Sequence, residues 1–478
     1  MCKNGCLLPE NAYLCMQLER HIQEMKQYKL TAPERLAQTI QLPASKSISN
    51  RALIIYALSG GSNLPQNLSD CDDTEVIIEA LRYMPDEINI KAAGTAMRFM
   101  SAYLSVMRGT HVITGTDRMQ HRPIAILVDA LRKLGAQIEY VGQEGFPPLK
   151  ITGTERMQHR PIAILVDALR KLGAQIEYVG QEGFPPLKIT GHKLQGGELS
   201  IPGNVSSQYI SALLMIGPML EDGLTLQLTG DIISRPYIDL TLWMMGEFGA
   251  EAKWSSADTI TVAHKPYKSR DYFIESDWSG ASYWYEMVAL SKDRDAEVKL
   301  TGLMDGSMQG DSTTRYIFSL LGVKTTFETQ KKGVPQMVTL KKNGRGVGKL
   351  EYDFVNAPDL AQTFVVTCAA LDIPFHFKGL STLKIKETDR IAALKKEMLK
   401  LGYVIHDVND SELYWDGERC EPDLQAGIDT YEDHRMALAF APFALRQDGL
   451  IINNPQVVTK SYPKFWDDLK LVGFNIEE

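Results

Sequence analysis

The sequence contains no hydrophobic run of the length that a membrane-spanning helix requires. Such a helix needs about 20 consecutive apolar residues, and the best candidate, Ile210 to Leu220, is short and interrupted by Gly217 and Pro218. The first residues also lack the longer apolar stretch of a secretory signal. We therefore expect neither membrane insertion nor export.

Cysteine is scarce, with six residues in a chain of 478. Their spacing matches neither paired metal ligands nor a disulfide framework. Cys2 and Cys6 alone lack the further ligands that a zinc site needs. We therefore expect no metal site and a reducing, cytoplasmic environment.

The chain also lacks an excess of positive charge. It contains 51 Lys and Arg residues against 59 Asp and Glu residues, which gives a net charge of −8. This balance argues against a nucleic-acid partner held by bulk electrostatics, because such proteins carry strongly basic surfaces. A small anionic substrate stays possible if a local cluster of cations lies within the acidic shell.

The length and composition suit a soluble globular chain of two domains or one large barrel, since 44% of the residues are hydrophobic and 23% are charged. Residues Ile113 to Lys150 recur as Ile151 to Lys188, with Asp117 replaced by Glu155 as the one difference. Structural repeats diverge because each copy packs against different neighbours. The near-identity therefore indicates either a recent tandem duplication or an artefact of sequence assembly.

A weaker repeat consists of an amphipathic helix that ends at glycine and is followed by a strand-like stretch. In the first example, Gly135 suits the left-handed C-cap position and Ala136 to Tyr140 alternates as a half-buried strand. The helix before it has one apolar stripe, formed by Ile124, Leu127, Val128, Leu131 and Leu134. Later junctions are 73, 80 and 71 residues apart, at Gly249, Gly322, Gly402 and Gly473. Units of this length that mix helix and strand predict an α/β repeat architecture.

Cationic, hydroxyl and amide side chains cluster at the predicted starts of several helices. The groups are Lys46, Ser47 and Arg51; Gly94 and Arg98; Ser206, Ser207 and Gln208; Asp359 after Pro358; Lys386 and Arg390, with Thr388 as the expected cap; and Arg435. Each cluster alone is compatible with a capped helix and solvated charges. Helix N-termini and cations both favour anions. Together the clusters therefore predict a site for a small molecule with several negative charges.

Ten short motifs occur in a fixed order along the chain. They are K-S-x-S-N-R from Lys46, G-T-A-M-R from Gly94, R-P-I, S-S-Q-Y from Ser206, S-x-P-Y from Ser234, S-M-Q-G-D from Ser307, P-D at Pro358, K-E-T-D-R from Lys386, D-H-R-M from Asp433 and K-S-Y-P from Lys460. In these motifs and their order, from about Tyr28 to Phe474, the chain resembles the 5-enolpyruvylshikimate-3-phosphate (EPSP) synthases. These are the 3-phosphoshikimate 1-carboxyvinyltransferases of aromatic amino-acid synthesis.

The resemblance implies an α/β fold of two domains, an inside-out α/β barrel with three βαβαββ units in each domain around a pseudo-threefold axis. It implies that the chain crosses between the domains near Leu42 and Asp277. Residues 43–276 then form one lobe, including both copies of the duplicated unit (113–150 and 151–188), and residues 25–42 plus 277–478 form the other. Residues 1–24 become an N-terminal extension, and the active site is expected between the lobes.

The resemblance also implies a reaction, the transfer of the enolpyruvyl group of phosphoenolpyruvate to the 5-hydroxyl of shikimate 3-phosphate with release of phosphate. A monomer without metal or organic cofactor is expected to carry it out. Asp359 is implied as the base, and Glu387 and Lys46 as the groups that move protons at the methylene carbon. The implied ligands of shikimate 3-phosphate are Lys46, Ser47, Arg51, Ser206, Ser207, Ser234, Asp359 and Lys386. Those of phosphoenolpyruvate are Lys46, Gly94, Gln208, Arg390, Arg435 and Lys460, with the arginine of the R-P-I motif, Arg122 or Arg160.

The arginine of the R-P-I motif occurs twice, and only one copy can occupy the pocket of the family. We therefore predict that one copy of the duplicated unit packs in the lobe and that the other is extruded or badly packed. Two alternative functions stay open, a catalytically impaired copy that only binds ligand and an enolpyruvyl transferase acting on UDP-N-acetylglucosamine. Members of the latter family usually carry a cysteine on the loop before this motif, where the chain has Met119 to His121.

Overall fold

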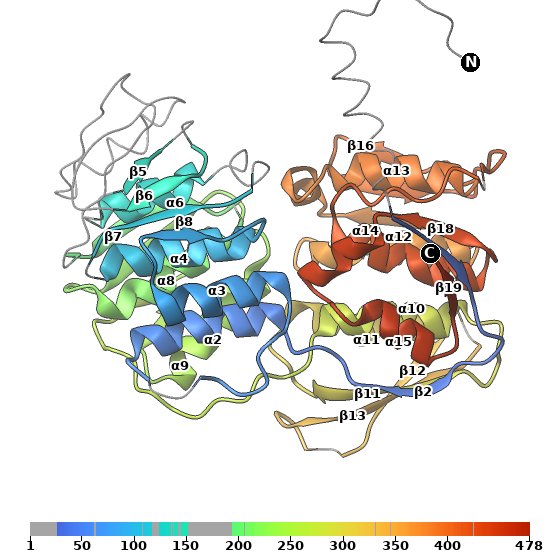
Figure 1. The fold of residues 1–478 in the computed structure, drawn as a ribbon, viewed down its shortest axis with the longest axis horizontal. Coiled ribbons are helices and arrows are strands. Elements are labelled where there is room, and N and C mark those ends of the chain that lie inside the picture. The colour runs from blue at the N-terminus through green and yellow to red at the C-terminus, as the bar shows by residue number, and fades with distance from the viewer. Residues whose placement is uncertain are drawn as a thin grey trace, which may run out of the picture.

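The computed structural model describes residues 26–478 with gaps, and these residues form two lobes side by side (Figure 1). The gaps are residues 62–63, 108, 117–123, 135, 137, 142–144, 152–193, 205, 330, 345 and 424. The expected extension at 1–24, Arg122, Arg160 and all but the first residue of the second copy therefore lie outside the described residues. No helix within the described ranges has both the length and the apolar character to cross a bilayer.

The first lobe, blue to green in Figure 1, contains two four-stranded sheets among its described residues. In each sheet two parallel strands are joined through a helix, and a second helix leads into an antiparallel hairpin. One unit comprises β3 (Glu87–Asn89), α4 (Gly94–Val106), β4 (His111–Thr114), α6 (Ala125–Lys133), β5 (Ile138–Tyr140) and β6 (Leu149–Ile151). The next comprises β7 (Gly197–Pro202), α8 (Ser207–Ile216), η1 (Gly217–Met219), β8 (Leu224–Thr229), α9 (Arg235–Glu247), β9 (Ala252–Trp254) and β10 (Thr259–Val262). Helices α2 (Lys46–Leu58) and α3 (Asp72–Tyr83) belong to a third unit with isolated bridges, Gln66 to Phe273 and Ala44 to Ser276.

The second lobe has three sheets among its described residues, with strand orders β12-β13-β11-β2, β14-β15-β17-β16 and β18-β1-β19. The first unit comprises β2 (Ala37–Ile40), α10 (Trp278–Leu290), β11 (Glu297–Met304), η2 (Gly310–Thr313), α11 (Thr314–Leu320), β12 (Val323–Phe327) and β13 (Pro335–Lys342). The second comprises β14 (Leu350–Asp353), η3 (Pro358–Leu360), α12 (Ala361–Ala370), β15 (Phe375–Lys378), η4 (Ser381–Ile385), α13 (Arg390–Lys400), β16 (His406–Val408) and β17 (Glu412–Trp415). The third comprises α14 (His434–Phe440), η5 (Ala441–Leu445), β18 (Leu450–Asn453), η6 (Pro455–Lys460), α15 (Phe465–Leu471), β19 (Asn475–Glu477) and the N-terminal strand β1 (Gln27–Thr31).

Helices form the interior of each lobe, and the sheets form its outside. Helix α4 buries every residue from Gly94 to Ser105, and α12 buries all of Ala361 to Ala370. A helix that is buried all round belongs to the core, whereas β10 alternates between buried and half-buried residues, as an outer strand does. The expected inside-out α/β architecture with βαβαββ units is confirmed.

Each lobe has its own hydrophobic core. The border between the two cores falls between residues 42 and 44 and again between residues 274 and 278. The two crossing segments run next to each other, because the Ser45 N–H donates to the Glu275 carbonyl at 2.8 Å. Two adjacent chain segments therefore connect the lobes.

The described part of the first copy of the duplicated unit packs inside the first lobe. Helix α6 contacts α4, α8 and β7. Its predicted apolar stripe is at most 1% exposed throughout, at Ile124, Leu127, Val128, Leu131 and Leu134. Strand β6 ends at Ile151, the first residue of the second copy. The first copy thus has a place in the lobe, and the extrusion of the second copy stays a prediction.

Candidate active site

Asp359 lies among three cations of the second lobe, on η3 directly before α12. Its Oδ1 accepts a hydrogen bond from Arg390 Nη1 at 2.9 Å and lies 3.3 Å from Lys386 Nζ. Its Oδ2 lies 3.3 Å from Arg435 Nη2. Burial raises the pKa of Asp359, but the charges of Arg435, Lys386 and Arg390 outweigh burial and hold this pKa well below its usual range. Asp359 is therefore a carboxylate at ordinary pH.

The Arg390 guanidinium joins this cluster to two further acids. Its Nε and Nη2 donate to the two oxygens of Asp433 at 2.7 Å and 3.1 Å, and Nη2 also donates to Glu387 Oε2 at 3.1 Å. The side chain of Arg390 is 1% exposed. A planar guanidinium suits this arrangement because its donors match two carboxylate oxygens at once.

All of the K-E-T-D-R segment except its last residue lies before α13. The helix begins at Arg390, and its N-cap is Asp389, whose side chain accepts a hydrogen bond from the Ala392 N–H at 3.0 Å. The expectation that Thr388 caps this helix is therefore wrong. A carboxylate at the N-cap both accepts this bond and faces the positive end of the helix dipole.

Lys46 extends the cluster from the first lobe, at the first residue of α2. Its Nζ lies 3.7 Å from Asp73 Oδ2. Burial lowers the pKa of Lys46, but Asp73 and other nearby acids outweigh burial and raise it, so Lys46 is a cation. The charges of Arg435 and Glu387 in the second lobe also act on it. Lys460 Nζ of η6 lies 3.1 Å from Glu387 Oε1, so Glu387 contacts cations on two sides.

The first lobe presents two helix starts with hydroxyl and amide groups. Helix α4 begins at Gly94, whose carbonyl accepts from Arg98 Nη1 at 2.8 Å, and the same Nη1 donates to Gln208 Oε1 at 3.1 Å. Ser206 is the N-cap of α8 and accepts from the Gln208 N–H at 3.4 Å. Ser207 is the first residue of that helix. The predicted groups of these two motifs are thus brought together.

Arg51 connects two helices of the first lobe, and Ser234 connects the first lobe to the second. Arg51 is 2% exposed and donates to the Ser47 carbonyl at 2.9 Å and to Thr241 Oγ1 at 2.8 Å, which ties α2 to α9. Ser234, the N-cap of α9, has a left-handed backbone with φ of 54°. Its N–H donates to the Val355 carbonyl of the second lobe at 3.0 Å. This hydrogen bond joins the two lobes at Ser234, whose conformation is uncommon for a residue with a Cβ.

The motifs of the sequence predict no role for three acids of the site. Asp433 and Asp73 form the ion pairs with Arg390 and Lys46, and Asp311 Oδ1 accepts from the Tyr237 hydroxyl of the other lobe at 3.2 Å. Asp433 lies in the D-H-R-M motif and Asp311 in the S-M-Q-G-D motif, so the sequence carried a signal for both. Asp73 lies outside every motif, and nothing in the sequence marks it.

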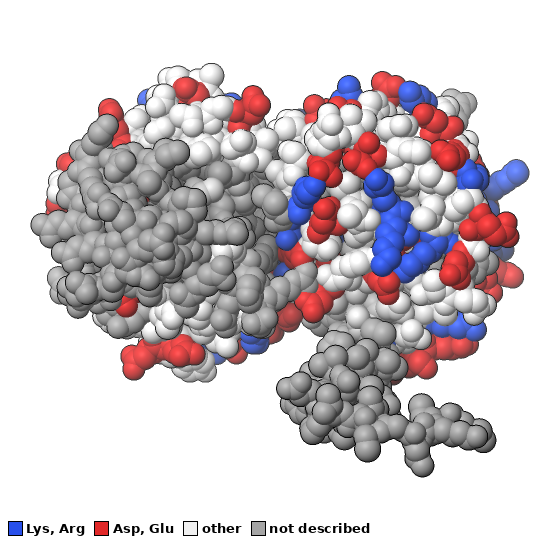
Figure 2. Space-filling model, turned by 90° about the horizontal axis from the view of Figure 1, so that it is seen from above, with Lys and Arg blue, Asp and Glu red and all other residues white. Residues whose placement is uncertain are grey.

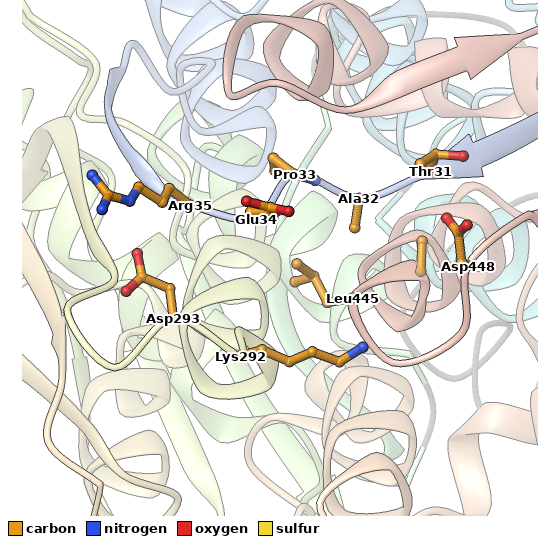
Figure 3. A pocket seen from close by; sticks show the side chains of 10 residues that line it. Thr31, Ala32, Pro33, Glu34, Arg35, Lys292, Asp293, Leu445 and Asp448 are labelled. Carbon is orange, nitrogen blue, oxygen red and sulfur yellow. The ribbon is translucent and has the colours of Figure 1, made fainter.

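Other charged and hollow features lie apart from this cluster. Figure 2 shows Lys and Arg next to Asp and Glu on the face of the second lobe near α13 and β16, where Lys384 pairs with Asp410 and Lys395 pairs with Asp407. The cavity of about 440 Å³ in Figure 3 contains none of the predicted site residues. Its lining is Thr31, Ala32, Pro33, Glu34, Arg35, Lys292, Asp293, Ala444, Leu445 and Asp448.

Cations of the described site come from both lobes. Lys386, Arg390 and Arg435 lie around Asp359, a carboxylate that can accept a proton, whereas Lys46 pairs with Asp73 and Lys460 pairs with Glu387. Such an arrangement binds phosphate and carboxylate groups well. Buried or half-buried cations keep their charge, and solvent screens their attraction to an anionic ligand only weakly. Asp359 can take the proton of a hydroxyl held among these groups.

Comparisons with known proteins identify the family of this chain. The model of the family "EPSP synthase (3-phosphoshikimate 1-carboxyvinyltransferase)" matches residues 30–89, 83–155 and 150–469, and its last two matches meet at the junction of the duplicated copies. A 3-phosphoshikimate 1-carboxyvinyltransferase of Bacteroides fragilis is 55% identical over 450 residues, which cover 94% of this chain and 98% of the relative. One from Vibrio cholerae is 33% identical over 471 residues, with 93% and 98% covered. The solved EPSP synthase of Acinetobacter baumannii, 19% identical, has the same fold, with a TM-score of 0.70 over 95% of this chain and 100% of that one. The chain therefore belongs to the EPSP synthase family.

Proposed function

We propose that this chain is a 3-phosphoshikimate 1-carboxyvinyltransferase of the shikimate pathway. It transfers the enolpyruvyl group of phosphoenolpyruvate to the 5-hydroxyl of shikimate 3-phosphate and releases phosphate. The observation that carries this proposal is the ionised Asp359 between Lys386, Arg390 and Arg435. Two substrates that together carry two phosphates and two carboxylates need such cations, and the attacking hydroxyl needs such a base.

The substrates divide between the groups of the site. Shikimate 3-phosphate is held by Lys46, Ser47, Arg51, Ser206, Ser207, Ser234, Asp359 and Lys386. Phosphoenolpyruvate is held by Lys46, Gly94, Gln208, Arg390, Arg435 and Lys460, together with Arg122 or Arg160, which lie outside the described residues. The hydrogen bond between Arg98 and Gln208 supports this division, because it fixes the amide of Gln208 beside Gly94.

Bond formation joins the 5-oxygen of shikimate 3-phosphate to C2 of phosphoenolpyruvate. The hydroxyl proton passes to Asp359, and the methylene carbon gains a proton from Glu387 or Lys46. Loss of a proton from the resulting methyl group restores the double bond while the C2–oxygen bond to phosphate breaks. Closure of the lobes excludes water and strengthens these charged contacts. A contact that supports closure is the bond of Thr459 Oγ1 to Asp72 Oδ2 across the lobes, at 2.9 Å.

The pH dependence of the reaction follows from the charges around Asp359. In the free protein its cations hold the pKa low, which makes Asp359 a weak base. Bound anionic substrates neutralise the same cations, so we expect the pKa of Asp359 to rise in the complex. The acid limb of kcat, which reports the complex, should lie at higher pH than the acid limb of kcat/KM, which reports the free enzyme. Coincident acid limbs in steady-state profiles would contradict this.

The chain is further proposed to act in the cytoplasm as a monomer of two lobes, residues 43–276 and residues 25–42 plus 277–478. The two separate cores support this division. The small anionic substrates are the expected partners, and no nucleic acid, membrane or cofactor is required.

Two deletions test the function and the effect of the duplication together. Removal of residues 151–188 joins Lys150 to Ile189, so β6 keeps the sequence Leu-Lys-Ile. Removal of residues 113–150 instead gives the same chain except for Glu155 in place of Asp117, which makes it a matched control. We expect both deletion variants and the full chain to release phosphate from shikimate 3-phosphate plus phosphoenolpyruvate.

The outcomes of this experiment distinguish the effects that the duplication can have and test the proposed function. Equal rates of phosphate release would mean that the extra unit does not affect activity. Activity in the two deletion variants alone would mean that the duplication disrupts the first lobe. The absence of phosphate release from all three chains would refute the proposed function. Phosphate release with UDP-N-acetylglucosamine in place of shikimate 3-phosphate would indicate the alternative enolpyruvyl transferase instead.

A further inference from the structure

The turn that leads into α14 has an unusual backbone. Tyr431 and Glu432 both adopt left-handed conformations, with φ of 52° and 53°. The Asp433 N–H donates to the Thr430 carbonyl at 2.8 Å and closes the turn. Glycine or asparagine normally occupies such positions. Other residues persist there where the surrounding structure holds them, often next to functional sites.

Glu397 of α13 holds this turn. Its side chain is fully buried, and its Oε1 accepts a hydrogen bond from the Tyr431 hydroxyl at 2.5 Å. Its Oε2 accepts from Lys400 Nζ at 2.7 Å and from the Asp429 N–H at 2.9 Å. Lys400 Nζ in turn donates to Asp429 Oδ2 at 2.9 Å. We call Glu397, Lys400, Asp429 and Tyr431 the brace.

The brace and the active site lie on the same two segments of the chain. Helix α13 begins at Arg390, which bonds both oxygens of Asp433, and Glu397 lies two turns further along the helix. Asp433 directly follows the left-handed turn. Arg435 lies two residues after Asp433, and its Nη2 is 3.3 Å from Asp359 Oδ2. The two segments are thus joined once at the site and once at the brace. A change in the turn would move Asp433 and Arg435 together.

We propose that Tyr431 and Glu397 are positioning residues for enolpyruvyl transfer. The hydrogen bond between them keeps the left-handed turn in place and so sets where Arg435 meets Asp359 and phosphoenolpyruvate. The inference rests on the proposed function, since it names what positions an arginine of that site. If the brace served stability alone, the ion pair of Glu397 with Lys400 would suffice and the Tyr431 hydroxyl would be dispensable for catalysis.

The Tyr431→Phe variant separates these two roles, because it removes one hydroxyl and leaves the ion pair. Tyr285→Phe is the matched control, because it removes a tyrosine hydroxyl of the same lobe that lies outside the site. The Tyr285 hydroxyl is hydrogen-bonded to Thr325 Oγ1 of β12 at 2.9 Å. We expect Tyr431→Phe to lower kcat/KM for phosphoenolpyruvate by about tenfold while KM for shikimate 3-phosphate changes by less than about twofold. Tyr285→Phe is expected to leave kcat/KM for phosphoenolpyruvate unchanged, even if it lowers the midpoint of thermal unfolding as much as Tyr431→Phe does.

Amide hydrogen exchange gives a second readout that needs no turnover. The N–H groups of Asp433 and Arg435 are hydrogen-bonded at 2.8 Å and 3.0 Å. They should exchange faster in Tyr431→Phe and at an unchanged rate in Tyr285→Phe. Equal kcat/KM and equal exchange in the two variants would overturn the inference. If the unaltered chain released no phosphate, the proposed function would fail, and the exchange rates would still decide whether Tyr431 holds the turn.

Discussion

Replacing Asp359 with asparagine is expected to lower kcat by about 10²–10⁴-fold, the usual contribution of a positioned base. Asparagine keeps the shape of the side chain and an oxygen acceptor, but it cannot take the proton of the 5-hydroxyl. The change also leaves Lys386, Arg390 and Arg435 without the carboxylate that they face. Steady-state phosphate release with both substrates saturating measures this loss.

A surface carboxylate of the same lobe provides the control for this variant. Asp407→Asn removes the partner of Lys395, and the side chains of this pair are 24% and 39% exposed. Because exposed pairs contribute little, kcat should change by less than about twofold in this control. A kcat of Asp359→Asn within about fivefold of the unaltered chain would remove Asp359 from the role of base.

The fold could be predicted at positions where the residue type itself indicates the backbone conformation. The predicted C-cap glycines have φ of 84° at Gly249, 84° at Gly322, 88° at Gly402 and 99° at Gly473. Because glycine takes this conformation at little cost, such a position can be recognised without a structure. The spacing of these glycines follows from the architecture, since each of them joins the second helix of one unit to the strand that follows it, β9, β12, β16 or β19.

Some contacts of the site were predictable on one side only. Lys46, Gly94, Ser207 and Arg390 are the first residues of α2, α4, α8 and α13, as their motifs indicate. The acids that they meet depend on how the units pack. Asp433, for example, reaches Arg390 across 43 residues of chain. The error at Thr388 has a local cause, because Thr388 and Asp389 are adjacent residues that both suit an N-cap and patterns locate helix ends only to within a residue or two.

Replacing Arg390 with methionine is expected to lower the free energy of unfolding of the second lobe by about 3–5 kcal/mol, the usual result of breaking a buried ion pair. Methionine fills much of the volume, but it leaves Asp433, which is 0% exposed, without the guanidinium that bonds both of its oxygens. Urea unfolding followed by tryptophan fluorescence measures the effect. Four of the six tryptophans, Trp278, Trp284, Trp415 and Trp466, lie in the second lobe.

Two further variants separate the uncompensated charge from lost packing. Lys341→Met removes an exposed lysine that pairs with Glu297 in the same lobe, and it should cost less than about 1 kcal/mol. The double variant Arg390→Met with Asp433→Asn removes both charges of the buried pair and keeps an oxygen acceptor at the N-cap of α14. If a lone buried carboxylate causes the instability, this double variant should recover a large share of the stability lost in Arg390→Met, although it stays inactive. A double variant that unfolds at the same urea concentration as Arg390→Met would show instead that packing around Arg390 holds this end of α13.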